Sequence, residues 1–141
     1  MKLTLLFSCM LALFFLGCKS QQYTFDELPD KQLVFGNGGG MTGAINTYVL
    51  IENGQLFRTS SLTKEVVELD AITKKEVKAI FLKLEELSIS KLDFNHPGNR
   101  YYFLEEVSLD KKHRIVWGAE DHKISKEYSD FYKQLKKLIE L

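Results

Sequence analysis

The chain has 141 residues, of which 45% are hydrophobic, and it carries 19 Lys and Arg against 19 Asp and Glu. This length fits one small globular domain, and the apolar fraction is too high for a disordered chain. A formal net charge of zero gives no overall attraction to phosphate backbones, so we expect no nucleic-acid partner.

The start of the chain has the order of parts of an export signal. Lys2 is followed by an apolar run from Leu3 to Leu16, and the sequence becomes polar at Lys19. The run is shorter than the roughly 20 residues that cross a bilayer as a helix. A secretory signal peptide is therefore favoured over a transmembrane anchor.

The export signal ends in Phe15-Leu16-Gly17-Cys18. This segment resembles the lipobox of bacterial lipoproteins, in which the cysteine is linked to diacylglycerol and becomes the new N-terminus. The resemblance implies cleavage between Gly17 and Cys18 and attachment to the membrane of the cell envelope through lipid. In a Gram-negative cell, Lys19 after the cysteine implies the outer membrane, facing the periplasm. The chain also resembles small lipoproteins of Bacteroidota, which carry no assigned activity.

The cysteines divide the chain into three parts. Cys9 lies in the removable signal and Cys18 takes the lipid, so the folded part has no thiol. We expect a signal peptide over residues 1–17, a lipidated tether over 18–30 and a single domain over 31–141. Two or three acyl chains give stable membrane attachment. Within the tether, only Tyr23, Phe25 and Leu28 offer apolar side chains that could dock on the domain.

The first half of the domain predicts strands. Gln32 to Phe35 is a short β-prone run that enters a glycine-rich loop at Gly36–Gly43, and apolar and polar residues alternate from Ala44 to Ile51. Asn53-Gly54 then predicts a type I′ hairpin turn into Gln55–Thr59. Whether Val66–Leu69 forms a further strand is left open.

The second half predicts two helices and a second hairpin. Thr73 and Glu76 form a capping box before a helix from Lys74 to about Leu87, and Ser125 is an N-cap for a terminal helix. Between them we expect a loop at Asn95–Asn99 and strands at Tyr101–Leu109 and Arg114–Trp117, joined by a turn at Asp110–Lys112. The predicted fold is α+β, an antiparallel sheet of four to five strands with two helices packed on one face. We expect Phe103 and Trp117 to pack under the helices and Tyr102 to lie on the open face.

The glycine-rich segment allows two interpretations. Its Gly38-x-Gly40-x-x-Gly43 spacing matches a dinucleotide-binding motif, but a β-prone run follows at Ala44 where that motif needs a helix. We therefore expect no cofactor there. The glycines serve either as a structural turn or as a recognition loop with Met41 at its apolar tip.

The domain from about Lys31 to Leu141 contains a combination of features. They are the run Gly38-Gly39-Gly40-Met41-Thr42-Gly43, a central amphipathic helix, a loop with Pro97 before Tyr101-Tyr102-Phe103, a hairpin and a closing Leu-rich helix. This combination resembles emfourin-type inhibitors of thermolysin-like metallopeptidases. The resemblance implies a peptidase partner and a contact loop at Gly38–Gly43.

The residue types that carry catalysis do not occur in the sequence at spacings typical of an active site. His96, His113 and His122 have no other His or Cys at a ligand spacing, so we expect no metal site. There is no Gly-x-Ser-x-Gly motif, and the adjacent carboxylates of Glu85-Glu86 and Glu105-Glu106 point apart on a helix or strand. We therefore expect the protein not to be an enzyme.

Three functional hypotheses follow. The first is a non-catalytic envelope lipoprotein that presents its domain to another envelope protein. The second is an inhibitor of a thermolysin-like metallopeptidase that uses the loops Gly36–Gly43 and Asn95–Asn99. The third is a protein that binds a small hydrophobic ligand in a cavity between the sheet and the helices.

Overall fold

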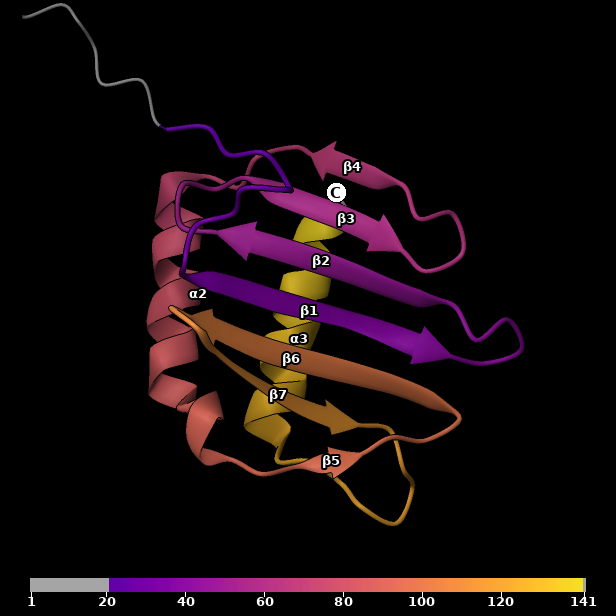
Figure 1. The fold of residues 1–141 in the computed structure, drawn as a ribbon. Coiled ribbons are helices and arrows are strands. Elements are labelled where there is room, and N and C mark those ends of the chain that lie inside the picture. The colour runs from indigo at the N-terminus through magenta and orange to yellow at the C-terminus, as the bar shows by residue number, and fades with distance from the viewer. Residues whose placement is uncertain (1–20, 141) are drawn as a thin grey trace, which may run out of the picture.

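The computed structural model describes residues 21–140, which form a mixed seven-stranded sheet with two α-helices (Figure 1). The strand order across the sheet is β4-β3-β2-β1-β6-β7-β5. The strands are β1 (Gln32–Gly39), β2 (Ile45–Ile51), β3 (Leu56–Ser60), β4 (Val66–Leu69), β5 (Asn95–His96), β6 (Arg100–Ser108) and β7 (Lys111–Trp117).

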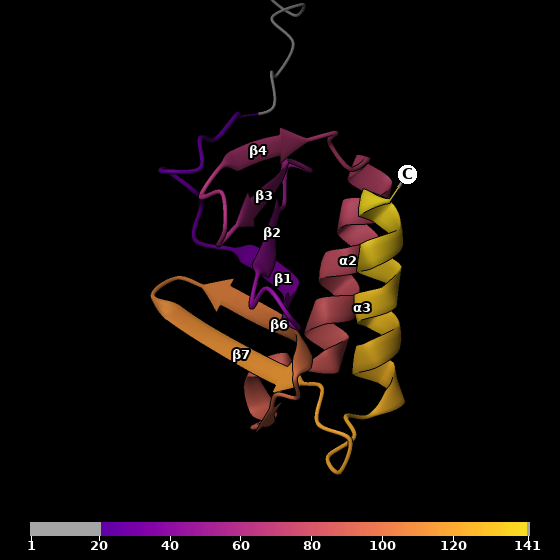
Figure 2. The ribbon, with the colours of Figure 1, turned by 90° about the vertical axis from the view of Figure 1, so that its right-hand side faces the viewer.

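The helices are α2 (Lys74–Leu87), a short 3-10 helix η2 (Ile89–Lys91) and α3 (Lys126–Ile139). Figure 2 shows α2 and α3 side by side on one face of the sheet. The α+β prediction is confirmed, but the strand count and the purely antiparallel sheet are wrong, because β5 pairs parallel to β7. No helix within residues 21–140 is long and apolar enough to cross a membrane.

The boundaries of α2 follow from local chemistry. The Thr73 side chain accepts a hydrogen bond from the Glu76 amide, and the Glu76 carboxylate accepts one from the Thr73 amide, as the capping box predicts. One face of the helix is buried, through Val77, Ile80, Phe81, Leu84 and Leu87. Ser88 ends the helix in the left-handed conformation, with φ 47°.

The β2–β3 hairpin forms where Asn53-Gly54 predicts it, but its turn is not type I′. That turn requires positive φ at both central residues, and only Gly54 has it, at 97°. The turn has three residues, Glu52 to Gly54, closed by a hydrogen bond from the Ile51 amide to the Gln55 carbonyl. Asn53 does not adopt positive φ; its side-chain oxygen instead accepts a hydrogen bond from the backbone amide of Gln55.

The sheet is buried on both faces. The helix-covered core includes Leu33, Phe35, Leu50, Leu104 and Ile115 from the strands. A second core on the opposite face contains Val34, Val49, Ile51, Phe57, Phe103 and Val107, and it is partly covered by Tyr23, Phe25 and Leu28. These last residues belong to the segment expected as a tether, and the Phe25 ring meets Phe57 edge to face with centroids 5.9 Å apart.

Two aromatic residues of β6 lie on the faces opposite to those predicted. Trp117 packs against Tyr132 of α3 as expected, whereas Phe103 belongs to the second core. Tyr102 lies on the helix side, where its ring contacts Trp117 and Tyr132. Because β6 carries apolar side chains on both faces, its alternation does not identify the face that the helices cover.

Candidate functional site

The predicted lipidation residue Cys18 and the predicted cleavage between Gly17 and Cys18 lie outside the described residues. Both stay predictions. The described chain begins next to them, at Gln21.

The glycine-rich segment is half strand and half turn, so the loop predicted over Gly36–Gly43 is wrong in its first half. β1 continues to Gly39, and only residues 40–44 connect it to β2. Gly36 pairs with Phe103 and Gly38 with Tyr101 on β6. A Cβ at Gly36 would lie 2.6 Å from Phe103 Cζ, so the glycine leaves room for that ring.

The turn itself needs glycine for its backbone conformation. Gly39, Gly40 and Gly43 have φ values of 88°, 76° and 63°. These values favour glycine, because a side chain in the left-handed region is strained. The Gly40 amide donates a hydrogen bond of 2.8 Å to the carbonyl of Asn99. The two loops expected as contact loops are therefore joined at one edge of the molecule.

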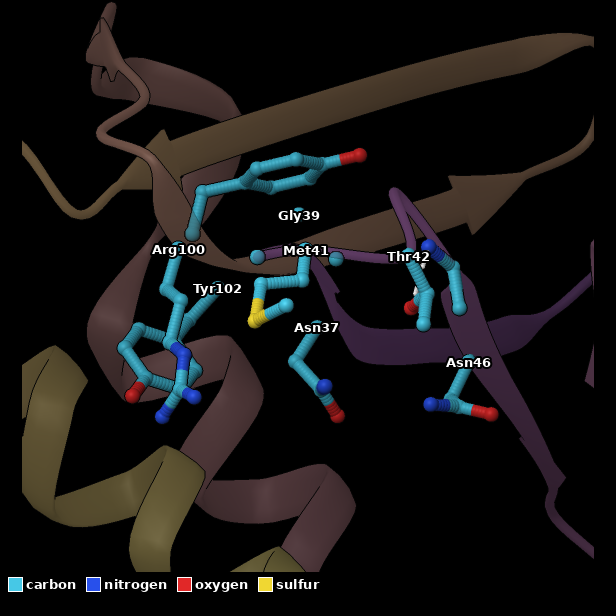
Figure 3. A pocket seen from close by; sticks show the side chains of 11 residues that line it. Asn37, Gly39, Met41, Thr42, Asn46, Arg100 and Tyr102 are labelled. Atoms are coloured by element: carbon cyan, nitrogen blue, oxygen red, sulfur yellow. Dashed lines mark hydrogen bonds between the residues drawn. The ribbon is translucent and has the colours of Figure 1, made fainter.

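A hollow of about 390 Å³ lies beside this turn. Asn37 is paired with Asn46 on one side and with Tyr102 on the other, so the three side chains share a face of the sheet. Figure 3 shows Asn37, Asn46 and Arg100 extending in the same direction as the Met41 side chain. The hollow is lined by Asn37, Gly38, Gly39, Gly40, Met41, Thr42, Ala44, Asn46, Arg100, Tyr101 and Tyr102.

The polar groups of this hollow are available to a partner. Within residues 21–140, the side chains of Asn37, Asn46 and Arg100 make no hydrogen bond or ion pair. The described residues that line the hollow include no carboxylate, so Arg100 gives the site a positive charge. Met41 is fully exposed. Amide and guanidinium groups beside an exposed apolar side chain favour an anionic or carbonyl-rich surface.

Tyr102 connects the hollow to a rigid aromatic cluster. Its ring centroid lies 5.3 Å from that of Tyr132 and 6.0 Å from that of Trp117, and the last two meet edge to face at 5.3 Å. The Tyr132 hydroxyl is buried and has no hydrogen-bond partner among the described residues. Burial raises the pKa of Tyr132 well above its usual value. The floor of the site is therefore part of the packed core.

The structure brings together two histidines that lie far apart in the sequence. His96 and His122 stack with ring centroids 3.9 Å apart, and His122 Nδ1 lies 3.1 Å from Asp121 Oδ1. This contact lowers the pKa of Asp121. Nothing in the sequence indicated the pair, because it depends on the parallel pairing of β5 with β7. No group of three or more His, Cys, Asp or Glu side chains within residues 21–140 is arranged to hold a metal ion.

An apolar hollow of about 270 Å³ lies where the end of α3 meets the start of α2 and the edge of the sheet. Its apolar lining consists of Leu56, Leu69, Ala71, Ile72, Leu138 and Ile139. Asp70 and Glu76 also border it. The hypothesis of a small hydrophobic ligand would place that ligand here, at the rim of the helix layer.

Neither a protein-family model nor a curated protein matches the chain.

Proposed function

We propose that this protein is a non-catalytic, lipid-anchored domain of the cell envelope that contacts a partner protein through the β1–β2 turn and the hollow beside it. The observation that carries the proposal is the fully exposed Met41, held on a glycine turn next to Asn37, Asn46 and Arg100, whose side chains make no hydrogen bond or ion pair with residues 21–140. Contact surfaces of proteins commonly combine an apolar anchor with arginine and a polar rim.

The path of the chain supports this arrangement. The Gln21 carbonyl accepts a hydrogen bond of 2.6 Å from the Asn53 side chain, in the β2–β3 turn. The β1–β2 turn lies at the other end of the seven-residue strand β2, which makes the separation roughly 24 Å. A lipid on Cys18 would therefore leave Met41 pointing away from the membrane, toward other envelope proteins.

Backbone geometry and a hydrogen bond hold the base of the turn. Three glycines in the left-handed region set the path of the turn, and the hydrogen bond from Gly40 to Asn99 ties it to the β5–β6 connection. A contact residue that is already ordered loses less conformational entropy on binding. Because Met41 is the fully exposed apolar side chain of this surface, partner affinity should depend most on it.

Site-specific photo-crosslinking in the native envelope tests the proposal. A photoreactive amino acid replaces Met41 in the full-length protein, and the matched control replaces Leu109, which is 70% exposed at the tip of the β6–β7 turn. We expect a discrete crosslinked protein from position 41 and none of the same mass from position 109. Identical products from both positions, or no product from position 41, would contradict the proposal.

A second candidate is inhibition of a thermolysin-like metallopeptidase. It is favoured by the hydrogen bond from Gly40 to Asn99, which joins the two predicted contact loops at one edge of the molecule. The purified mature domain should then inhibit such a peptidase at micromolar concentration, and Met41→Asp should weaken the inhibition. Full peptidase activity in the presence of excess domain would remove this candidate and leave the first intact.

A further inference from the structure

Two turns project from the same end of the sheet. Gln32 of β1 is paired with Ile51 of β2 and with Val107 of β6, so β2 and β6 run in the same direction. Asn53 lies two residues beyond Ile51, and Leu109 lies two residues beyond Val107. The tips of the β2–β3 and β6–β7 turns therefore stand at the same level, and the ends of β2 and β6 that lead into them are about 10 Å apart across two strand spacings.

The chain leaves the domain toward Cys18 at this level. The Gln21 carbonyl is bonded to the Asn53 side chain, and the Tyr23 amide donates to Gln55 at 2.8 Å. Gln21 is the third residue after Cys18, and three residue steps span at most about 11 Å when fully extended. A lipid on Cys18 would consequently hold this end of the sheet against the bilayer.

Exposed leucines are found at this end. Leu109 is 70% exposed and has φ 53°, a backbone conformation that glycine or asparagine usually supplies. Leu82 of α2 is 51% exposed and lines a hollow together with Lys31 and Glu52, which places it beside the β2–β3 turn. Two large apolar side chains thus face outward on the side where the chain continues to Cys18.

Lysines accompany these leucines. Lys74 and Lys78 line the same hollow as Leu82, and Lys111 and Lys112 follow Leu109. Within residues 21–140 these four lysines make no ion pair, whereas Lys31 lies 3.0 Å from both Glu52 and Glu85 and offsets the charge of one of these two carboxylates. Asp110 remains as an acidic group at the turn tip. With Asp30 beside Lys31 and one of the two glutamates not offset, the lysines leave a small excess of positive charge at this end.

We propose that this end of the domain rests on an anionic lipid surface, with Leu82 and Leu109 entering the interface and the four lysines facing lipid phosphates. The inference rests on the lipid attachment in the proposed function. Apolar side chains flanked by lysine are the pattern of interfacial membrane contact. The contact need not be strong, because a short tether keeps the surface at a high effective concentration.

To test this, the domain is attached to vesicles by chemical coupling, so that the experiment does not require lipidation of Cys18 in the cell. The chain from Cys18 onward contains every residue of both cores, and Cys18 is its only thiol. That thiol is coupled to a maleimide lipid in vesicles of phosphatidylethanolamine and phosphatidylglycerol that also carry brominated acyl chains. Leu109→Trp and Leu82→Trp report contact through bromine quenching, and Met41→Trp is the matched control at the opposite end.

We expect a large loss of the added fluorescence and a blue shift for Leu109→Trp and Leu82→Trp, and neither change for Met41→Trp. Lys111→Gln with Lys112→Gln should reduce the quenching at position 109, and replacing phosphatidylglycerol with phosphatidylcholine should do the same. Equal quenching at all three positions, or none at 109 and 82, would overturn the inference. Normal processing of Cys18→Ser in cells would instead refute the lipid attachment itself, so the two failures can be told apart.

Discussion

The attachment of the N-terminal segment to the sheet depends on one buried side chain, that of Gln55. It is 4% exposed and makes four hydrogen bonds. Its carbonyl oxygen accepts from the Tyr23 amide at 2.8 Å and from Asn53 at 2.7 Å. Its amide donates to the Tyr23 carbonyl at 3.1 Å and to Glu68 at 2.9 Å. The side chain thus joins the segment before β1, the β2–β3 turn and edge strand β4.

Gln55→Leu keeps a similar volume and removes all four hydrogen bonds. A typical net hydrogen bond contributes about 1 kcal/mol, and the partners at Tyr23, Asn53 and Glu68 regain part of this from water. We therefore expect the free energy of unfolding to fall by about 2–4 kcal/mol in urea denaturation. Protease cleavage before β1 should also become faster, because the segment loses both backbone bonds of Tyr23.

Gln32→Leu is the matched control. Gln32 is half-buried and donates one side-chain hydrogen bond, to the Pro29 carbonyl at 2.8 Å. Its substitution should cost about 1 kcal/mol or less. If Gln55→Leu destabilised the protein no more than Gln32→Leu, the reasoning that Gln55 fixes the N-terminal segment would be refuted.

Three further substitutions test the packing described above. Gly36→Ala should lower the free energy of unfolding by about 1–3 kcal/mol, since its Cβ would collide with Phe103 and the Asn46 backbone; an unchanged urea midpoint would contradict this. Tyr132→Phe should leave stability unchanged or raise it by about 1 kcal/mol, because it removes a buried hydroxyl without a partner among the described residues. Burial holds the folded-state pKa of Tyr132 above that of an unfolded tyrosine, so stability should fall as pH rises above about 10, and Tyr132→Phe should reduce that fall. Thr73→Ala should cost about 1 kcal/mol by removing the cap of α2, and helicity measured by circular dichroism at intermediate urea should decrease.

Local patterns in the sequence were sufficient for the helices and for the existence of the hairpins. The capping box at Thr73 and the apolar spacing from Val77 to Leu87 operate within a few residues of each other, so no distant contact is needed to find α2. The Asn53-Gly54 pair likewise located a turn. The predicted turn type was wrong, because Asn53 does not adopt positive φ and its side chain accepts a hydrogen bond from the Gln55 backbone amide.

The candidate site could be located only in part. The exposed tip at Met41 and the glycine requirement could be predicted from the sequence. The lining residues come from three strands, and the register between strands cannot be predicted from any one segment; these residues are Asn37, Asn46, Arg100 and Tyr102. The stacking of His96 on His122 was missed for the same reason. An asparagine or arginine within a strand does not indicate a binding site in the sequence, because its role depends on which residues the neighbouring strands place beside it.

The sequence by itself determined the α+β class, the two helices and the main hairpins, because caps, turns and periodicity are short-range and each segment expresses them independently. It also predicted the export signal and Cys18 attachment. Only the tertiary structure decided that β4 and β5 join the sheet, that Phe103 faces away from the helices over Gly36, and that Tyr23 and Phe25 cover the second face. These outcomes depend on pairing between strands that are distant in the chain. Such pairing decides which face of a strand with apolar residues on both sides the helices cover, and which glycine lies opposite an aromatic ring.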